Sequence, residues 1–137
     1  MLKLVGEIIL RSAYRILADS EGNYRVTHQD CHGAEYCQAV AVKVARYVQR
    51  KCQGETVTVA EARSVLESAP KELEVPYDYG YKLGFYAQSV LLVLVATRQA
   101  EYSKIGQRFD FTVLKPKATV KTRRAKKGQV GRTKQPR

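Results

Sequence analysis

The stretch HQDCHGAEYC, residues 28 to 37, contains both histidines of the chain and two of its three cysteines. Histidine nitrogens and cysteine thiolates bind zinc, and a cysteine beside a histidine can act as a nucleophile. Structural zinc sites usually draw their ligands from two short segments roughly a dozen residues apart, whereas this set is contiguous. A nucleophilic cysteine would also need an orienting group and an oxyanion pocket, and the sequence indicates neither. We therefore interpret the stretch as a loop entering a helix, with Asp30 and Gly33 at the entry and Cys37 facing the core, and we expect no metal.

The segment from Lys115 to Arg137 carries the strongest chemical signal. It has 10 Lys and Arg and no acidic residue, whereas residues 1 to 114 have 14 Lys and Arg against 13 Asp and Glu, a net charge of +1. Such a segment neutralises phosphates without reading bases, so we expect nucleic acid, either DNA or RNA, as its partner. The tail residues expected to bind it are Lys121, Arg123, Arg124, Lys126, Lys127, Arg132, Lys134 and Arg137.

Few residues suggest catalysis. Asp110 and Lys115 form a D-x4-K arrangement, but the companion acidic residue of a metal-dependent nuclease is missing. Glu72 and Glu74 fall in KELEVP, which we expect to be an exposed loop. The chain has no Gly-rich phosphate loop and no Ser-centred nucleophile elbow. We therefore expect no enzymatic activity, no cofactor and no small-molecule substrate.

The elements that would position these residues begin with an ambiguous stretch. Residues 1 to 12 fit either a helix or a strand, and AYRILA and YRVT flank the turn-rich DSEGN as a hairpin. Residues 34 to 52 predict an amphipathic helix whose apolar stripe includes Cys37, Val40 and Val44. Gly54 would end this helix.

The remaining elements are two helices and a hairpin. The second helix begins after Thr58, which forms a capping box with Glu61, and it ends before Pro70. A third helix is expected from about Asp78 to Arg98, and its apolar, Tyr-rich residues from Tyr79 onward predict burial or a protein partner. In AEYSKIGQRFDFTVL, Gly106-Gln107 suits a two-residue turn that would place Tyr102 opposite Phe111.

From Ala34 to Leu114 this order of helix, short extended piece, helix, long helix and hairpin resembles a winged helix-turn-helix domain. TVTVAEARSVL at the second helix, the Leu/Val-rich third helix, and SKIGQRFDF as the wing carry the resemblance. In that family the third helix usually enters the major groove and the wing contacts backbone or minor groove. The resemblance thus implies nucleic-acid contacts by Lys82, Gln88 and Ser89 in the helix and by Lys104, Gln107 and Arg108 in the wing.

These patterns predict an α+β fold with a small three-helix core and a C-terminal β-hairpin. An N-terminal helix or strand plus hairpin, residues 1 to 33, would precede the winged-helix-like body, residues 34 to 114, and a basic extended tail, residues 115 to 137, would follow it. Three cysteines are too few for a secreted disulfide framework and favour a reducing, cytoplasmic setting. The longest apolar run, SVLLVLVAT, is too short to span a membrane, and we expect no membrane partner.

Two functions fit these expectations. The first is a non-catalytic nucleic-acid-binding protein, such as a transcriptional regulator, whose tail clamps the phosphate backbone. The second is a protein adaptor, or a subunit of a ribonucleoprotein or ribosome-like assembly. In the second, the helix from Tyr79 to Arg98 would bind protein and the tail would bind RNA.

Overall fold

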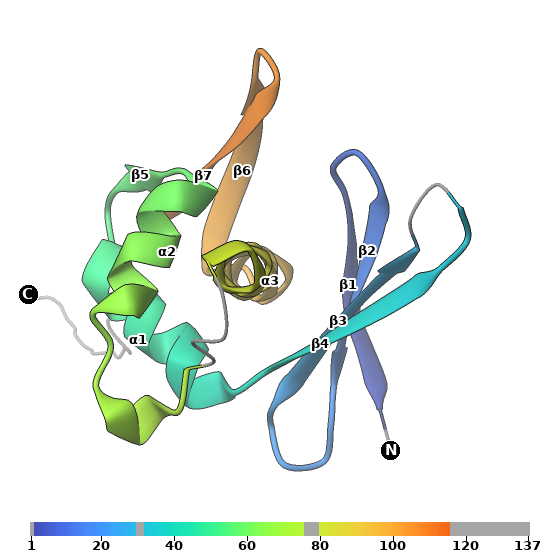
Figure 1. Ribbon diagram of the computed structural model, residues 1–137, viewed down its shortest axis with the longest axis horizontal. Helices are drawn as coiled ribbons and strands as arrows, with labels where there is room; N and C mark the ends of the chain where they lie inside the picture. Colours follow the sequence, from blue (N-terminus) through green and yellow to red (C-terminus); the bar gives the residue numbers. More distant parts are fainter. Residues whose placement is uncertain (1, 30–31, 76–79, 116–137) are drawn as a thin grey trace, which may run out of the picture.

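The structure, a computed structural model, describes residues 2–29, 32–75 and 80–115 (Figure 1). Sheet A is a four-stranded antiparallel meander of β1 (Lys3–Ile9), β2 (Ala13–Ala18), β3 (Tyr24–Gln29) and β4 (Glu35–Val40). Sheet B has the order β5-β7-β6 and contains β5 (Thr56–Val57), β6 (Ala100–Ile105) and β7 (Arg108–Val113). The helices are α1 (Val42–Cys52), α2 (Val59–Glu67), the 3-10 helix η1 (Lys71–Leu73) and α3 (Gly80–Ala96).

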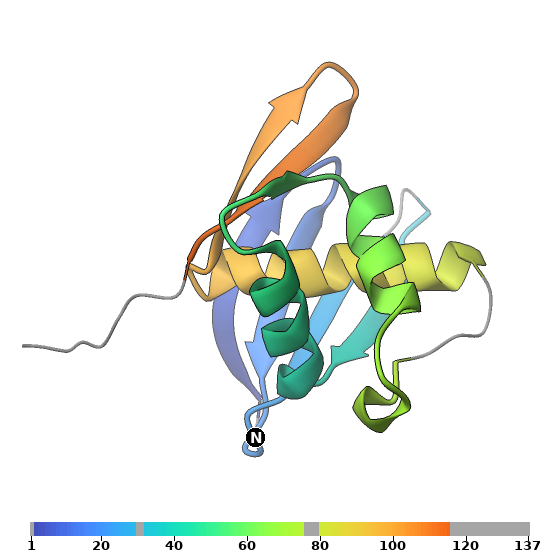
Figure 2. The same ribbon diagram turned by 90° about the vertical axis from the view of Figure 1, so that its left-hand side faces the viewer.

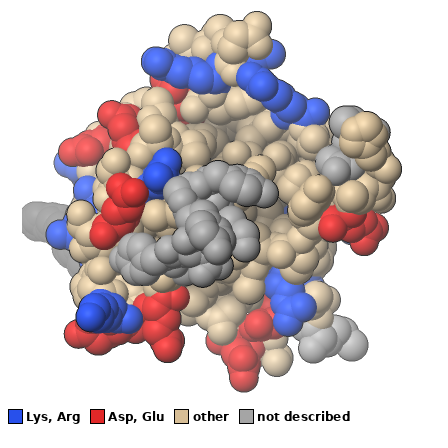
Figure 3. All heavy atoms as spheres, viewed as in Figure 1, with Lys and Arg blue, Asp and Glu red and all other residues tan. Residues whose placement is uncertain are grey.

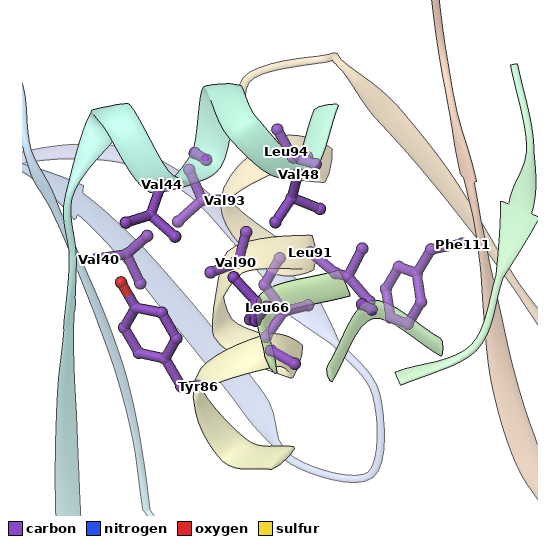
Figure 4. Close-up of a cluster of buried hydrophobic side chains, with 14 of the residues drawn as sticks. Val40, Val44, Val48, Leu66, Tyr86, Val90, Leu91, Val93, Leu94 and Phe111 are labelled. Atoms are coloured by element: carbon purple, nitrogen blue, oxygen red, sulfur yellow. The ribbon is translucent and has the colours of Figure 1, made fainter. Parts of the chain in front are cut away.

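Helix α3 runs through the centre of the molecule. Sheet A covers one side of it, and α1 and α2 cover the other (Figures 1 and 2). Its residues from Val90 to Leu94 are fully buried. Figure 4 shows four of these side chains among those of α1, α2 and β7; the labelled residues are Val90, Leu91, Val93 and Leu94 of α3, Val44 and Val48 of α1, Leu66 of α2 and Phe111 of β7. The apolar composition of α3 therefore reflects packing within the chain.

Sheet A buries one face and exposes the other, as expected for strands with a two-residue side-chain period. Ile8, Ile16, Val26 and Val40, one from each strand, are all buried. Asp19 shapes the turn between β2 and β3, because its Oδ1 accepts hydrogen bonds from the backbone N–H groups of Glu21 and Asn23, at 2.9 and 3.0 Å.

The predicted fold, a small three-helix core with a C-terminal β-hairpin after an N-terminal helix or strand plus hairpin, is wrong, because the chain forms two antiparallel sheets and is richer in strands. Residues 1 to 12 hold strand β1, and Glu35 to Val40 form strand β4 rather than the first turns of a helix. Strand β4 pairs along its length with β3, from Tyr24 opposite Val40 to Gln29 opposite Glu35. Sheet A therefore extends beyond the boundary expected at residue 33.

Helix α1 begins at Val42, where a distant residue takes over the role of the cap. Its N-cap residue, Ala41, has no side chain that can accept a hydrogen bond. Instead Oδ1 of Asn23, from the turn between β2 and β3, accepts from the N–H of Val42 at 3.1 Å. One of the unpaired donors at the helix start is thereby satisfied.

Several other expectations are confirmed. Thr58 accepts a hydrogen bond from the N–H of Glu61 at 3.2 Å, and the Glu61 carboxylate accepts from the N–H of Thr58 at 2.8 Å, which completes the capping box. Strands β6 and β7 meet at the two-residue turn, with Tyr102 opposite Phe111. Gly54 follows α1 with a φ of 80°, a left-handed value suited to glycine. None of the described helices has both the length and the apolar character needed to cross a membrane.

Candidate nucleic-acid interface

Helix α1 exposes a basic face. Its sequence, VKVARYVQRKC, contains four basic residues and no acidic one, and Lys43, Arg46, Arg50 and Lys51 are all exposed. Nζ of Lys43 lies 3.1 Å from Oε1 of Glu74, so this charge is partly compensated. Within the described part of the chain, Arg46 and Arg50 have no ion-pair partner. Their guanidinium groups are therefore available to an external anion.

The described chain ends beside this helix. After β7, Lys115 packs against the turn that follows α1, where a Cβ added to Gly54 would come within 3.1 Å of Lys115 Cε. The N–H of Gly54 donates to the carbonyl of Val113 at 2.7 Å, which fixes the position of this junction. The basic segment thus begins next to the basic end of α1. The predicted tail residues, Lys121, Arg123, Arg124, Lys126, Lys127, Arg132, Lys134 and Arg137, lie outside the described residues.

The predicted wing residues lie at the tip of the β6–β7 hairpin. Lys104 and Arg108 are both exposed. Nε of Arg108 lies 3.0 Å from Oδ1 of the buried Asp110, so part of its charge is neutralised within the hairpin. The space-filling view shows Lys and Arg side chains across this end of the molecule, above a hollow in the surface (Figure 3).

The residues predicted to read bases from the third helix do not form one exposed row. Gln88 is half-buried, and Ser89 is buried, so Ser89 is closed to a DNA groove in this arrangement. Lys82 belongs to α3, but its side chain lies outside the described part of the chain. Among the described residues, Gln88 of the third helix and Arg108 of the wing come together, because both line the same cleft.

This cleft has a volume of about 360 Å³ and lies between the two sheets. Its described lining contains two arginines and no Asp or Glu: Leu10, Arg11, Tyr14, Thr58, Val59, Ala60, Gln88, Arg108, Phe109 and Phe111. Arg11 in the β1–β2 turn donates a hydrogen bond to the backbone carbonyl of Gln107 in the β6–β7 turn. The Tyr102 hydroxyl donates to the carbonyl of Ile9 at 3.4 Å. These contacts hold the two hairpins together along the cleft.

No family model, curated protein or solved structure matches the chain. The resemblance to winged helix-turn-helix domains therefore stays a prediction.

The decapeptide HQDCHGAEYC spans the end of β3 and the start of β4, so its interpretation as a helix entry is wrong. Cys37 is an exposed thiol on β4 and does not face the core. Among the described residues, no three His, Cys, Asp or Glu side chains gather in a way that could hold a metal ion. Asp30 and Cys31 lie outside those residues, and the absence of a metal stays a prediction.

His28 takes part in an aromatic row instead. Its ring lies 4.6 Å from that of Tyr14 on β2 and 5.1 Å from that of Tyr36 on β4, measured between centroids. Neither this row nor the place of Arg11 in the cleft is predicted by the sequence patterns. Residues 14, 28 and 36 come together only through the register of three strands, for which no local sequence signal exists. The acid-free composition of α1, by contrast, was visible in the sequence.

Proposed function

We propose that the protein is a non-catalytic nucleic-acid-binding protein whose basic tail and helix α1 together contact the phosphate backbone. The observation that carries the proposal is charge placement. A segment with 10 Lys and Arg and no acid begins beside Gly54, at the end of a helix that exposes Arg46 and Arg50 without acidic partners in the described chain. Such contiguous positive charge attracts polyanions regardless of their sequence.

The position of α3 limits how the protein could read a sequence. For α3 to enter a major groove, it would have to leave the layers that bury Val90 to Leu94 on both sides. We therefore place the principal phosphate contacts on the tail and α1, with Lys104 at the hairpin tip as a further contact. A cytoplasmic, reducing setting is part of the proposal, since Cys37 is an exposed free thiol.

The salt dependence of binding tests this assignment. In the full-length chain, Arg123, Arg124, Lys126 and Lys127 are changed to Gln, and the binding constant for a labelled duplex is measured by fluorescence anisotropy over a range of salt concentrations. Each lost phosphate contact lowers the slope of log K against log salt by about 0.9, so we expect the slope to fall by roughly three to four.

The matched control removes the same charge elsewhere. Lys3, Arg25, Arg63 and Lys71 lie outside α1 and the tail, and changing these four to Gln should leave the slope near the wild-type value. Equal loss in both variants would mean that net charge alone drives binding. A tail variant that keeps the wild-type slope would refute the phosphate-contact assignment.

A second candidate function is a subunit of a ribonucleoprotein or another protein assembly. The apolar side chains exposed on and just before the edge strand β1 favour it, since Leu2, Leu4 and Ile9 are 43%, 49% and 64% exposed. Purification from the native source after nuclease treatment would test it. A protein partner that survives nuclease and is lost with Ile9→Lys would favour the assembly role, and loss of all partners with nuclease would favour nucleic acid alone.

A further inference from the structure

An acidic segment around η1 lies against the basic face of α1. Lys43 belongs to the first turn of α1, and η1 lies beside that turn (Figures 1 and 2). The Lys43 ammonium group donates hydrogen bonds to the backbone carbonyl of Glu72, at 3.2 Å, and to Oε1 of Glu74, at 3.1 Å. An ammonium group has three N–H donors, so this one uses two of them inside the chain. The fold therefore supplies Lys43 with an internal anion.

Glu74 has a backbone conformation that its side chain does not favour. Its φ of 57° and ψ of 40° lie in the left-handed region, and its N–H donates to the carbonyl of Lys71 at 2.9 Å. Packing on either side holds this conformation, because Leu73 packs against the core and Val75 is buried. Glycine or asparagine would suit this backbone better, so the turn by itself does not account for a glutamate here. The exposed carboxylate points instead to a role at the surface.

The ion pair between Lys43 and Glu74 is open to exchange. The two side chains are 47% and 80% exposed. Exposed ion pairs stabilise a fold only weakly, because water screens the charges and both side chains lose conformational freedom. A phosphate group that reaches Nζ of Lys43 can therefore replace the Glu74 carboxylate without loss of the fold.

This ion pair lies at one end of the proposed phosphate-binding surface. Lys43, Arg46 and Arg50 are spaced by three and four residues, so they share one face of α1. Arg46 and Arg50 have no ion-pair partner within the described part of the chain. The end of α1 that follows Arg50 is the one beside Lys115, where the basic tail begins. At the opposite end, the charge of Glu74 repels a phosphate and compensates the charge of Lys43.

We propose that Glu74 competes with nucleic-acid phosphates for Lys43 and so limits the affinity of the α1 surface. In the free protein, the Glu74 carboxylate occupies Nζ of Lys43. Bound nucleic acid contacts Arg46, Arg50 and the tail, and it gains Lys43 only by displacing Glu74. This inference rests on the proposed function and adds an autoinhibitory contact to the same surface.

The test is a double-mutant cycle in the full-length chain, with binding of a fluorescein-labelled duplex followed by anisotropy over a range of salt concentrations. Glu74→Gln removes the competing charge and keeps the side-chain shape. It should raise the affinity roughly two- to five-fold, the range that exposed ion pairs span. It should also steepen the slope of log K against log salt by about 0.9, as for one added phosphate contact. Lys43→Gln should change binding little in wild type but should remove the gain in the Glu74→Gln background.

Glu67→Gln is the matched control. Glu67 forms an exposed ion pair with Arg63 within α2, at 3.5 Å, so its removal changes the net charge equally and frees an arginine outside α1. This control should leave the slope near the wild-type value. Glu74→Asn, in contrast, should give a gain like that of Glu74→Gln, because it also removes the carboxylate and it suits the left-handed backbone. Circular dichroism checks that all variants fold.

The outcomes separate this inference from the proposed function. If wild type binds the duplex and Glu74→Gln binds it with the same affinity and slope, the competition is refuted while the charge-based function stands. An equal gain from Glu67→Gln would also refute it, since net charge alone would then explain the effect. A gain that survives Lys43→Gln would refute it as well, because the effect would not pass through Lys43. If wild type does not bind at low salt, the proposed function fails, and this inference fails with it.

Discussion

Tyr86 shows how one buried polar group ties α3 to the junction between sheet A and α1. Its residue is 4% exposed, and its hydroxyl forms a hydrogen bond with the backbone of Ala41, the residue before α1. Figure 4 shows the ring beside Val40, with its oxygen directed away from α3. Burial raises the pKa of Tyr86 to about 12, and the hydrogen bond with Ala41 lowers it in part. The neutral, hydrogen-bonded phenol is therefore the form that the fold stabilises.

Removing this hydroxyl should destabilise the protein measurably. We expect Tyr86→Phe to lower the free energy of unfolding by about 1 kcal/mol, because the backbone of Ala41 loses its buried partner. Denaturant unfolding followed by circular dichroism measures the change. Tyr24→Phe removes a hydroxyl from a half-buried residue that has no hydrogen-bond partner for it among the described residues, so this change should cost less. An equal effect of the two substitutions would contradict the role assigned to Tyr86.

The same residue makes a prediction at high pH. The pKa of Tyr86 rises from about 10 in the unfolded chain to about 12 in the folded one. Between these values the folded chain retains a proton that the unfolded chain has lost, so stability falls as pH rises. Tyr86→Phe should lose less stability than wild type over this interval, as measured by denaturant titrations at several pH values. A wild-type decline that Tyr86→Phe reproduces in full would contradict the prediction.

At the scale of elements, the sequence predicts best where a few neighbouring residues determine the backbone. The Thr58–Glu61 capping box and the Gly106-Gln107 turn are such cases, and both appear where expected. Residues 34 to 41 are the opposite case. Their apolar positions continue the helical stripe of α1, yet they also alternate as in a strand. Strand β3 provides the backbone hydrogen-bond partners that make this segment a strand. The pattern of residues 34 to 41 alone cannot reveal these partners.

The residues of the candidate site also differ in whether the sequence alone can identify them. Its basic residues in the tail and in α1 can be identified from composition. Its cleft and aromatic row cannot, because Arg11 and Gln107 are 96 positions apart and meet only when two sheets pack together. The third helix illustrates the same limit. Its apolar composition fits a partner-binding surface as well as a core, and only the packing of α3 between sheet A and helices α1 and α2 distinguishes the two.

The capping box provides a prediction for α2. Thr58→Ala removes the side-chain acceptor at the helix N-terminus and should cost about 1 kcal/mol of folding stability. Ser64→Ala, at an exposed position inside the same helix, is the control and should cost nothing, because alanine favours helix. Both are measured by denaturant unfolding. Equal stability of the two variants would mean that α2 does not depend on its cap.

At the scale of the whole molecule, the charge is divided unevenly. The part up to Leu114 carries a net +1 and holds the cleft, whereas the remaining residues carry +10 and begin beside α1. We infer that the tail supplies most of the affinity for nucleic acid and most of its salt dependence.

The most direct test of the central claim is the salt titration of binding by the full-length chain. A fluorescein-labelled single strand and its duplex are titrated with the protein between about 50 and 200 mM salt. We predict binding to both probes at low salt and a fall in affinity of roughly a thousand-fold or more across this range, as expected for six or more phosphate contacts. No binding at low salt, or an affinity that salt leaves unchanged, would contradict a nucleic-acid function based on the tail and α1.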